Sequence, residues 1–233
     1  MDKDQLIEKL LDIRSKGFIK TLRIHDTGIG YTLEELLGVK ENNIQLPDIG
    51  ELELKAKRIN SQSMLTLATK SPLPKGVNKK LFEEYKYLDS DGKDCLHSTV
   101  YGSRINQQGF RVILQGKNIV LQNSKNITAY WPLTIFDDIL KLKSNKIILV
   151  FAITKGKPKS INEEFHFKEA YLLSDLNIDK FKTAIENDKL KIDIRIGSFK
   201  SGERKGQYHD HGTGLRIHKR DFLQLYNNFE QLV

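Results

Sequence analysis

Apolar and polar positions alternate with a period of two in two stretches of the chain, residues 51–58 and residues 191–197. This is the period of a β-strand with one buried face. Residues 145–154 and 164–173 are instead rich in branched and aromatic side chains, which predicts more deeply buried strands. The segment Gln115-Gly116-Lys117-Asn118 lies between two alternating stretches and predicts a hairpin turn. These patterns together predict a sheet.

Apolar residues with helical spacing predict helices around these strands. Thr32, followed three positions later by Glu35, forms a capping box that would open a short second helix. The other predicted helices are a first one with Leu6, Leu10, Leu11 and Ile13 that stops at Lys16-Gly17, one from Trp131-Pro132 through about Lys141, one with Ile178, Phe181, Ala184 and Ile185, and a final one with Phe222, Leu225, Tyr226 and Phe229. The predicted fold class is α/β, with a mixed central sheet flanked by helices. No repeat or linker divides residues 1–233, so a single domain is expected.

The composition is basic, with 38 Lys and Arg against 30 Asp and Glu, a formal net charge of +8 and a pI near 9.3. This balance favours a phosphate-rich partner such as nucleic acid, although a solvated basic face would give the same total. The single cysteine, Cys95, cannot form an internal disulfide, and the charged start Met1-Asp2-Lys3-Asp4 is unlike a signal peptide. The longest apolar run, residues 147–153, is too short to cross a bilayer. These features predict a cytoplasmic protein without membrane association.

Two acidic residues and a lysine have the arrangement that metal-assisted phosphodiester hydrolysis needs. Because side chains alternate along a strand, Glu53 and Lys55 share one face, opposite Leu54. Asp48 precedes the strand at a Pro-Asp turn, from which its carboxylate could reach the same face. Asp48 and Glu53 would hold Mg²⁺, with the Leu54 carbonyl as a further ligand, and Lys55 would hold and polarise the attacking water.

Spacing alone does not establish this site. Glu51, Glu53, Lys55 and Lys57 could also form the solvated face of a half-exposed strand, and spacing by itself favours that plainer interpretation. An acid followed at a distance by Glu-x-Lys occurs by chance in many charged proteins. The wider sequence therefore has to decide between the two.

Several further motifs follow in a fixed order along nearly the whole chain. They are Thr27-Gly28-Ile29-Gly30 with Leu33-Glu34-Glu35-Leu36-Leu37, Pro47 to Lys55, Leu65-Thr66-Leu67-Ala68-Thr69-Lys70-Ser71-Pro72, Asp193-Ile194-Arg195-Ile196-Gly197, Ser201-Gly202, Lys205-Gly206, and His209-Asp210-His211-Gly212-Thr213 with Leu215-Arg216-Ile217. In these motifs and their order the chain resembles the MvaI/BcnI restriction endonucleases, a family of the PD-(D/E)XK nuclease superfamily related to the MutH repair nickases. Several rare motifs in one order are more specific than any one of them.

The resemblance implies catalytic roles for Asp48, Glu53 and Lys55, the residues already selected on chemical grounds. It also implies that Glu34 approaches the metal site, although a helix-surface carboxylate would look the same in the sequence. The implied fold is of the PD-(D/E)XK, restriction endonuclease-like kind, with two lobes around a DNA-binding cleft. The catalytic lobe would be centred on about residues 1–130, and the recognition elements would lie mainly in residues 190–220.

The strand of residues 191–197 is predicted to present charged side chains on one face while its isoleucines pack into the core. On that face Arg195 could bind guanine bidentately, and Asp193 could accept a hydrogen bond from cytosine, so the two suit a G·C pair. Without the resemblance, a surface salt bridge between Asp193 and Arg195 would be the preferred interpretation.

The glycine-punctuated, basic stretch of residues 198–220 resembles a loop that embraces DNA. The family resemblance places contacts to the recognition sequence at His209, His211 and Arg216. A transition-metal site at His209-x-His211 with Asp210 is the alternative, but it has no third clear ligand. Lys70 and Arg104 are further candidates for DNA contact, and each could also be a routine solvated residue.

The predicted function is that of a type II restriction endonuclease that uses Mg²⁺ to hydrolyse double-stranded DNA at a CC-N-GG site and leaves a 5′-phosphate and a 3′-hydroxyl. The Asp-Ile-Arg and His-Asp-His segments favour the MvaI branch and CC(A/T)GG, whereas the first hundred residues, such as residues 38–44, are more similar to the BcnI branch and CC(G/C)GG. A monomer without an obligate protein partner is expected. The alternatives are a MutH-like nickase and a DNA-binding protein without catalysis.

Overall fold

The computed structural model describes residues 1–39, 48–134, 145–199 and 202–233. Three sequence predictions lie partly outside these residues. They are Pro47 of the catalytic stretch, with most of the segment 38–44, the part of the helix predicted through about Lys141 that follows residue 134, and residues 200 and 201 of the stretch 198–220, which include Ser201 of the Ser201-Gly202 motif. Among the described residues, no helix has the length and apolarity that crossing a membrane requires.

The chain forms two compact units, each built from separated stretches of sequence. Unit 1 comprises residues 1–63, 139–177 and 226–233, and unit 2 comprises residues 64–138 and 178–225. The predicted catalytic lobe of about residues 1–130 is therefore divided, because strands after residue 63 pair with strands from the C-terminal half rather than with those of unit 1. That the two units act together as a single domain stays a prediction.

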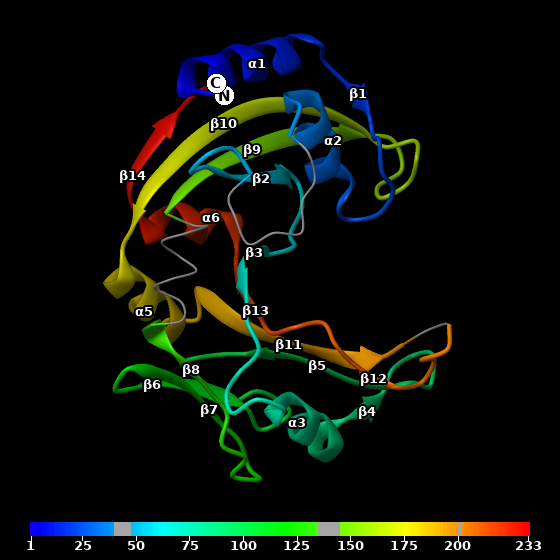
Figure 1. Ribbon diagram of the computed structural model, residues 1–233, viewed down its shortest axis with the longest axis vertical. Coiled ribbons are helices and arrows are strands. Elements are labelled where there is room, and N and C mark those ends of the chain that lie inside the picture. Colours follow the sequence, from blue (N-terminus) through cyan, green and yellow to red (C-terminus); the bar gives the residue numbers. More distant parts are fainter. Residues whose placement is uncertain (40–47, 135–144, 200–201) are drawn as a thin grey trace. The chain divides into compact units, whose positions relative to one another are not determined.

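A five-stranded sheet forms the centre of unit 1 (Figure 1). Its strands follow the order β1-β10-β9-β2, and β14 also pairs with β10. The elements of unit 1 are α1 (Lys3–Ser15), β1 (Ile19–Lys20), α2 (Gly28–Leu37), β2 (Glu53–Arg58), β9 (Lys146–Lys155), β10 (Glu164–Leu176) and β14 (Tyr226–Gln231). The pairing of β2 with β9 is parallel and the others are antiparallel, so the sheet is mixed, as predicted. Among the described strands, β2 is the last of this order.

Helices α1 and α2 contribute to the hydrophobic core of this unit. As predicted, Leu6, Leu10 and Ile13 of α1 are buried, whereas Leu11 is 48% exposed. Together with Ile29, Leu33 and Leu37 of α2 they form one cluster with sheet residues such as Leu54, Val150 and Phe165. The same cluster holds the apolar side of β2 in place, which fixes where its polar side points.

Helix α2 begins at Gly28, so the capping box predicted at Thr32 and Glu35 is wrong. Thr32 lies inside the helix, where its hydroxyl donates to the Gly28 carbonyl at 2.7 Å and accepts from the Leu22 amide at 3.0 Å. Gly28 packs so closely that a Cβ there would come within 2.2 Å of the Arg23 carbonyl oxygen. This close approach allows the helix to start one turn earlier than the sequence pattern indicated.

Two predicted helices are partly strands. Residues 130–132 form β8 (Tyr130–Pro132), so the helix predicted from Trp131-Pro132 starts later, at Leu133, and only residues 133 and 134 of it are described. The final predicted helix ends early, after α6 (Lys219–Phe222) and the 3-10 turn η2 (Leu223–Leu225), and Tyr226 begins β14. Pairing with β10 supplies hydrogen bonds to residues 226–231 that local apolar spacing does not reveal.

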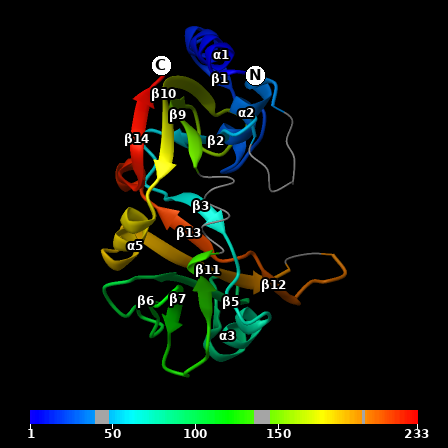
Figure 2. The ribbon, with the colours of Figure 1, turned by 60° about the vertical axis from the view of Figure 1, so that its left-hand side comes forward.

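Unit 2 contains a six-stranded and a three-stranded sheet (Figure 2). The larger sheet has the order β3-β13-β11-β5-β4 with β12 paired to β11, and the smaller has the order β6-β7-β8. The remaining elements are β3 (Leu65–Thr69), α3 (Val77–Tyr85), β4 (Tyr87–Leu88), β5 (Asp94–Val100), β6 (Arg111–Gln115), β7 (Asn118–Gln122), α5 (Ile178–Glu186), β11 (Leu190–Ser198), β12 (Tyr208–Asp210) and β13 (Gly214–Ile217). The hairpin predicted at residues 115–118 is confirmed between β6 and β7.

A buried ion pair joins β2 to the loop before β10 and allows a test of stability. Arg58 donates two hydrogen bonds to the Glu163 carboxylate, at 2.7 and 2.8 Å, and the Glu163 side chain is only 1% exposed. Burial alone would raise the pKa of Glu163, but hydrogen bonds from Arg58 and the Lys159 amide outweigh burial and lower it. The ionised pair therefore stabilises the fold.

Glu163→Gln should reduce the free energy of unfolding near pH 7 by about 3 kcal/mol, because it leaves a buried guanidinium without its counter-charge. Since the folded-state pKa is lowered, the difference from the parent should persist above the ordinary carboxyl value of 4.5 and shrink as the pH falls below it. Chemical denaturation at several pH values measures this. Glu164→Gln is the matched control, because the Glu164 to Lys155 pair is exposed and spans 3.9 Å. Equal effects of both substitutions would contradict the argument.

Candidate active site and recognition pocket

Glu53 and Lys55 lie side by side on β2, as the strand period predicted. The Lys55 ammonium donates to Glu53 Oε1 at 2.8 Å, and the two side chains are 17% and 12% exposed. Lys57, next on the same face, is 6% exposed and donates to the Ser63 carbonyl and hydroxyl. Of the four charges on this face only Glu51 is largely exposed, so a solvated charged face does not describe β2.

A tight turn brings Asp48 back against the strand. Ile49 and Leu52 exchange two backbone hydrogen bonds around Gly50 and Glu51, and Gly50 has a φ of 56°, in the region that favours glycine. As a result, Asp48 Oδ2 accepts a hydrogen bond from the Leu54 amide at 2.8 Å. The Asp48 carboxylate is thus anchored at the backbone between Glu53 and Lys55.

The Leu54 carbonyl points toward the same edge of β2 as Asp48. Along a strand, the amide and carbonyl of one residue point to the same side, and the Leu54 amide binds Asp48 rather than β9. Because β2 is the last of the described strands in this sheet, this side points away from β9. The geometry therefore places a backbone oxygen near the Asp48 carboxylate.

These groups fit a hard divalent cation. Glu53 Oε2 is buried and has no hydrogen-bond partner among the described residues, so it is an acceptor available for a further ligand. Two carboxylates and a backbone carbonyl are oxygen ligands of the kind that Mg²⁺ prefers, and Mg²⁺ usually keeps several waters in addition. Within residues 1–39, 48–134, 145–199 and 202–233, no three His, Cys, Asp or Glu side chains gather as a metal site. Water and the carbonyl would therefore have to complete the coordination.

Glu34 is not part of such a three-ligand group. It lies on α2 and lines a pocket of about 290 Å³ together with Arg23, Tyr31 and Ala56 of β2. Arg23 stacks over the Tyr31 ring at 3.7 Å. Glu34 is thus near the catalytic strand, and its approach to a metal stays a prediction.

Tyr226 is a neighbour of the candidate centre that the sequence pattern missed. It is 4% exposed at the start of β14. Burial raises the pKa of its hydroxyl, and the negative charge of Glu53 raises it further, so the tyrosine stays protonated. The sequence assigned Tyr226 to a helix, and only the pairing of β14 with β10 brings it to this site.

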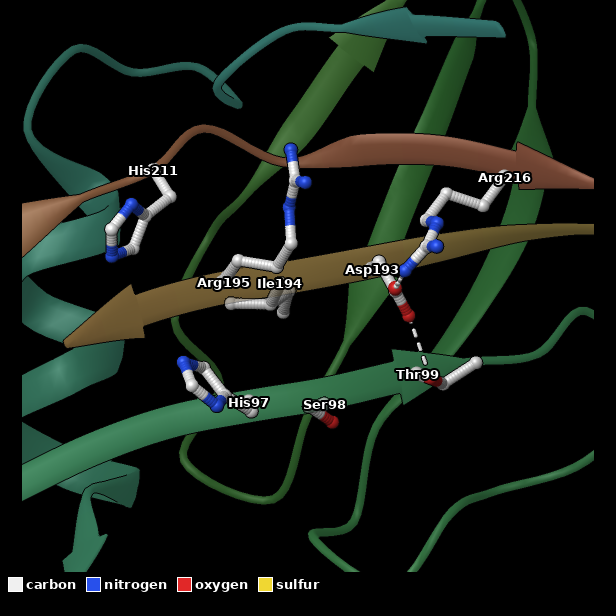
Figure 3. Close-up of a pocket in the computed structure, with 8 residues that line it drawn as sticks. All are labelled: His97, Ser98, Thr99, Asp193, Ile194, Arg195, His211 and Arg216. Atoms are coloured by element: carbon white, nitrogen blue, oxygen red, sulfur yellow. Dashed lines mark hydrogen bonds and ion pairs between the residues drawn. The ribbon is translucent and has the colours of Figure 1, made fainter. Parts of the chain in front are cut away.

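The larger sheet of unit 2 carries a second candidate site, a pocket of about 470 Å³ (Figure 3). Its lining residues come from β5, β11, β13 and the segment between β12 and β13: His97, Ser98, Thr99, Asp193, Ile194, Arg195, His211 and Arg216. Four of these, Asp193, Arg195, His211 and Arg216, were predicted to contact DNA. The structure therefore brings together most of the predicted recognition residues.

Asp193 forms an ion pair with Arg216. The alternative interpretation of the sequence, a surface salt bridge between Asp193 and Arg195, is therefore wrong. Arg216 Nη1 donates to Asp193 Oδ2 at 2.7 Å, and the Thr99 hydroxyl donates to Oδ1 at 2.6 Å. The Arg216 guanidinium also donates to the Met64 carbonyl at 3.2 Å. Asp193 is 8% exposed, so this group is a buried, ordered cluster rather than a mobile surface charge.

Arg195 keeps its guanidinium available. Its Nε donates to the Gly212 carbonyl at 3.3 Å, which fixes the direction of the side chain. Across the part of the chain that the structure describes, its two terminal amino groups have no hydrogen-bond partner. An oriented fork with open donors is what bidentate binding of a planar acceptor pair needs.

The two histidines of the His-Asp-His segment have different surroundings. His209 stacks on Phe199, with ring centroids 4.1 Å apart, and the Arg204 guanidinium lies over the Phe199 ring, 4.2 Å from its centroid. Burial lowers the pKa of His211, and the nearby His209, His97 and Arg195 lower it further, so it is neutral near pH 7. Neutral His211 has one donor and one acceptor to offer.

Asp210 between them is a structural residue. Its carboxylate accepts from the Gly212 amide at 2.7 Å and from the Asn78 amide group at 2.8 Å. Burial of the Tyr208 hydroxyl raises its pKa to about 12, and the charge of Asp210 contributes to the rise. Because the described residues hold no three-ligand group here either, a transition-metal site at this segment is not supported.

Lys70 and Arg104, the two backbone-contact candidates, do not line this pocket. Lys70 is exposed, and its main chain is held by Thr213 and by the Trp131 indole. Arg104 stacks on Tyr101 at 3.9 Å and pairs with Asp188 at 3.2 Å, with its side chain 61% exposed. Both remain candidates for phosphate contact.

Known proteins provide an independent comparison. The model of the MvaI/BcnI restriction endonuclease family matches residues 7–226. A solved complex of restriction endonuclease MvaI with its cognate DNA substrate is similar at 30% identity over 100% of both chains, with a TM-score of 0.86. A structure of MvaI in the absence of DNA is similar at 31% identity over 100% of this chain and 99% of that one, with a TM-score of 0.58. The comparison with curated proteins gave no match.

Proposed function

The chain belongs to the MvaI/BcnI restriction endonuclease family, and from this premise we propose that it is a type II enzyme that cuts double-stranded DNA with Mg²⁺. Membership makes the protein a DNA-hydrolysing enzyme, with the mixed α/β fold of MvaI. In the proposal, unit 1 carries hydrolysis in a fold of the PD-(D/E)XK kind and unit 2 reads the sequence. The observation that carries the proposal is the grouping of Asp48, Glu53 and Lys55 around the Leu54 backbone.

Asp48, Glu53 and the Leu54 carbonyl would hold Mg²⁺, with Glu34 as a further candidate. When bound, the ion would offset negative charge on the scissile phosphate and on the leaving oxygen. Lys55 has three donors, of which one binds Glu53 at 2.8 Å, so the others can orient a water for attack on phosphorus. Glu53 in turn keeps the ammonium in one position. Attack with departure of the 3′ oxygen would leave a 5′-phosphate and a 3′-hydroxyl.

Recognition would use the pocket of unit 2. Arg195 has open donors that suit the O6 and N7 acceptors of guanine, which supports a site of the CC-N-GG type. Asp193, His211 and Arg216 line the same pocket, and His209 is adjacent. We propose CC(A/T)GG as the favoured site and CC(G/C)GG as the next, because Asp193-Ile194-Arg195 and His209-Asp210-His211 resemble the MvaI branch. Action as a monomer without an obligate protein partner is part of the proposal.

Incubation of the purified protein with plasmid and phage DNA tests this function. Discrete fragments are expected with magnesium and none with EDTA, because the carboxylates alone cannot offset charge on the phosphate. Sequencing of the fragment ends should map them to CC-N-GG and identify the central pair. Single-strand nicking that needs a repair partner would favour a MutH-like enzyme, and binding without any cleavage would favour a non-catalytic DNA-binding protein.

A further inference from the structure

His97 lies directly opposite Arg195 in the recognition pocket. The two residues are register partners in the antiparallel pair of β5 and β11, and both line the pocket. His97 is exposed, whereas the flanking Leu96 and Ser98 are buried. No sequence motif singled out His97, because its position follows only from how β5 pairs with β11.

The backbone geometry brings these two side chains close together. The Arg195 carbonyl accepts from the His211 amide at 3.0 Å, and the His97 carbonyl accepts from the Tyr87 hydroxyl at 3.2 Å, so each points away from the other strand. Arg195 and His97 are therefore a non-hydrogen-bonded pair. In such pairs the Cα atoms are about 4.5 Å apart and the side chains stand side by side.

Thr99, Asp193 and Arg216, on one part of the pocket floor, are joined by hydrogen bonds among their own side chains. Thr99 and Arg216 each donate a hydrogen bond to Asp193, one to each carboxylate oxygen. Both Asp193 carboxylate oxygens therefore accept hydrogen bonds within the fold, whereas the buried Arg216 Nε has no partner among the described residues. The two hydrogen bonds to Asp193 hold β5, β11 and β13 together across the pocket.

The neighbouring part of the pocket floor, with Arg195 between His97 and His211, is open. Figure 3 shows the three side chains on the same side of the strands, away from the hydrogen-bonded pair of Asp193 and Thr99. In the described parts of the chain, the His97 ring has no hydrogen-bond partner. The Arg195 amino groups and the His97 ring are not used in contacts that stabilise the fold. They are therefore available to bind a ligand.

We propose that His97 is a specificity-determining residue, which donates an imidazole N–H to the N7 acceptor of the purine next to the guanine read by Arg195. This rests on the proposed DNA recognition. Successive bases on one DNA strand are about 3.4 Å apart, so two side chains that stand side by side on paired strands can reach neighbouring bases. Neutral histidine has one N–H donor, and purines present N7 in the major groove. In a GG step, Arg195 and His97 would read adjacent guanines.

Duplexes in which 7-deazaguanine replaces one guanine at a time test this contact, because the replacement removes only N7. For the parent, the modified base at the His97 position should lower kcat/KM about tenfold. His97→Ala should lower kcat/KM about tenfold on normal DNA and should show no further loss on that modified duplex. Arg195→Ala identifies which guanine its own side chain reads, and the His97 position should be the adjacent base.

His218→Ala is the matched control, since His218 lies in the same unit but outside the pocket, near Lys191. This variant should lose activity on the modified duplex as the parent does. A merely structural role of His97 would leave the 7-deaza penalty intact in His97→Ala, and that result would overturn the proposal. If the parent cuts nothing, the proposed hydrolysis fails, but competition binding between normal and 7-deaza duplexes still tests the His97 contact.

Discussion

Lys55→Ala should lower the rate of DNA cleavage by about 10³-fold while DNA binding persists. The substitution removes the ammonium that lies 2.8 Å from Glu53 and would orient the attacking water. It leaves the Asp48 anchor on the Leu54 amide and the whole of unit 2 intact. Single-turnover cleavage with magnesium, and binding to the same duplex without magnesium, measure the two parts separately.

Lys146→Ala is the matched control for this prediction. Lys146 also pairs with a glutamate near the start of β2, Glu51, at 2.6 Å, but both side chains are exposed. Removal of this pair should leave the cleavage rate unchanged, because an exposed ion pair contributes little to stability and its charges are screened. Equal loss of cleavage in both variants would mean that any nearby positive charge has the effect assigned to Lys55. Cleavage by Lys55→Ala at the parent's rate would show that Lys55 is not an active-site residue.

Arg195→Ala should reduce discrimination between the cognate site and a site with one guanine changed by about 1 to 3 kcal/mol, which is roughly 5- to 150-fold. The physical reason is that the substitution removes a guanidinium that the Gly212 carbonyl orients and whose two terminal amino groups are open. The ratio of kcat/KM values for cognate and single-substitution duplexes measures discrimination.

Arg104→Ala is the control variant for Arg195→Ala. Arg104 is exposed, pairs with Asp188 outside the pocket, and would contact phosphate rather than a base. Its loss should weaken binding to all sequences alike and reduce the salt dependence of binding by about one charge. If Arg195→Ala instead left the discrimination ratio at the parent's value, its role in base recognition would be excluded.

Local patterns in the sequence predicted the parts of the molecule that depend on neighbouring residues. The period of two in β2 placed Glu53 beside Lys55, and the structure has them in contact. The same period in β11 predicted that Ile192, Ile194 and Ile196 are core residues, and all three are buried. Such predictions succeed because strand geometry alone determines which side chains share a face.

The same local patterns were wrong where pairing with a distant strand decided the outcome. The apolar residues 222–229 have helical spacing, but residues from Tyr226 onward form β14 because β10 offers them an edge. Trp131 belongs to β8, which pairs with β7, and its indole donates to the Lys70 carbonyl. Propensity is a weak preference that such tertiary contacts override.

The sequence by itself determined the chemical groups of this protein, two carboxylates, a lysine and a basic recognition segment, together with their order along the chain. Only the tertiary structure decided which of them act together. Asp193 is paired with Arg216 and with Thr99, 94 positions away, and His97 stands beside Arg195. These contacts depend on the register of strands that are distant in the sequence, and a shift of one residue would turn every side chain to the other face.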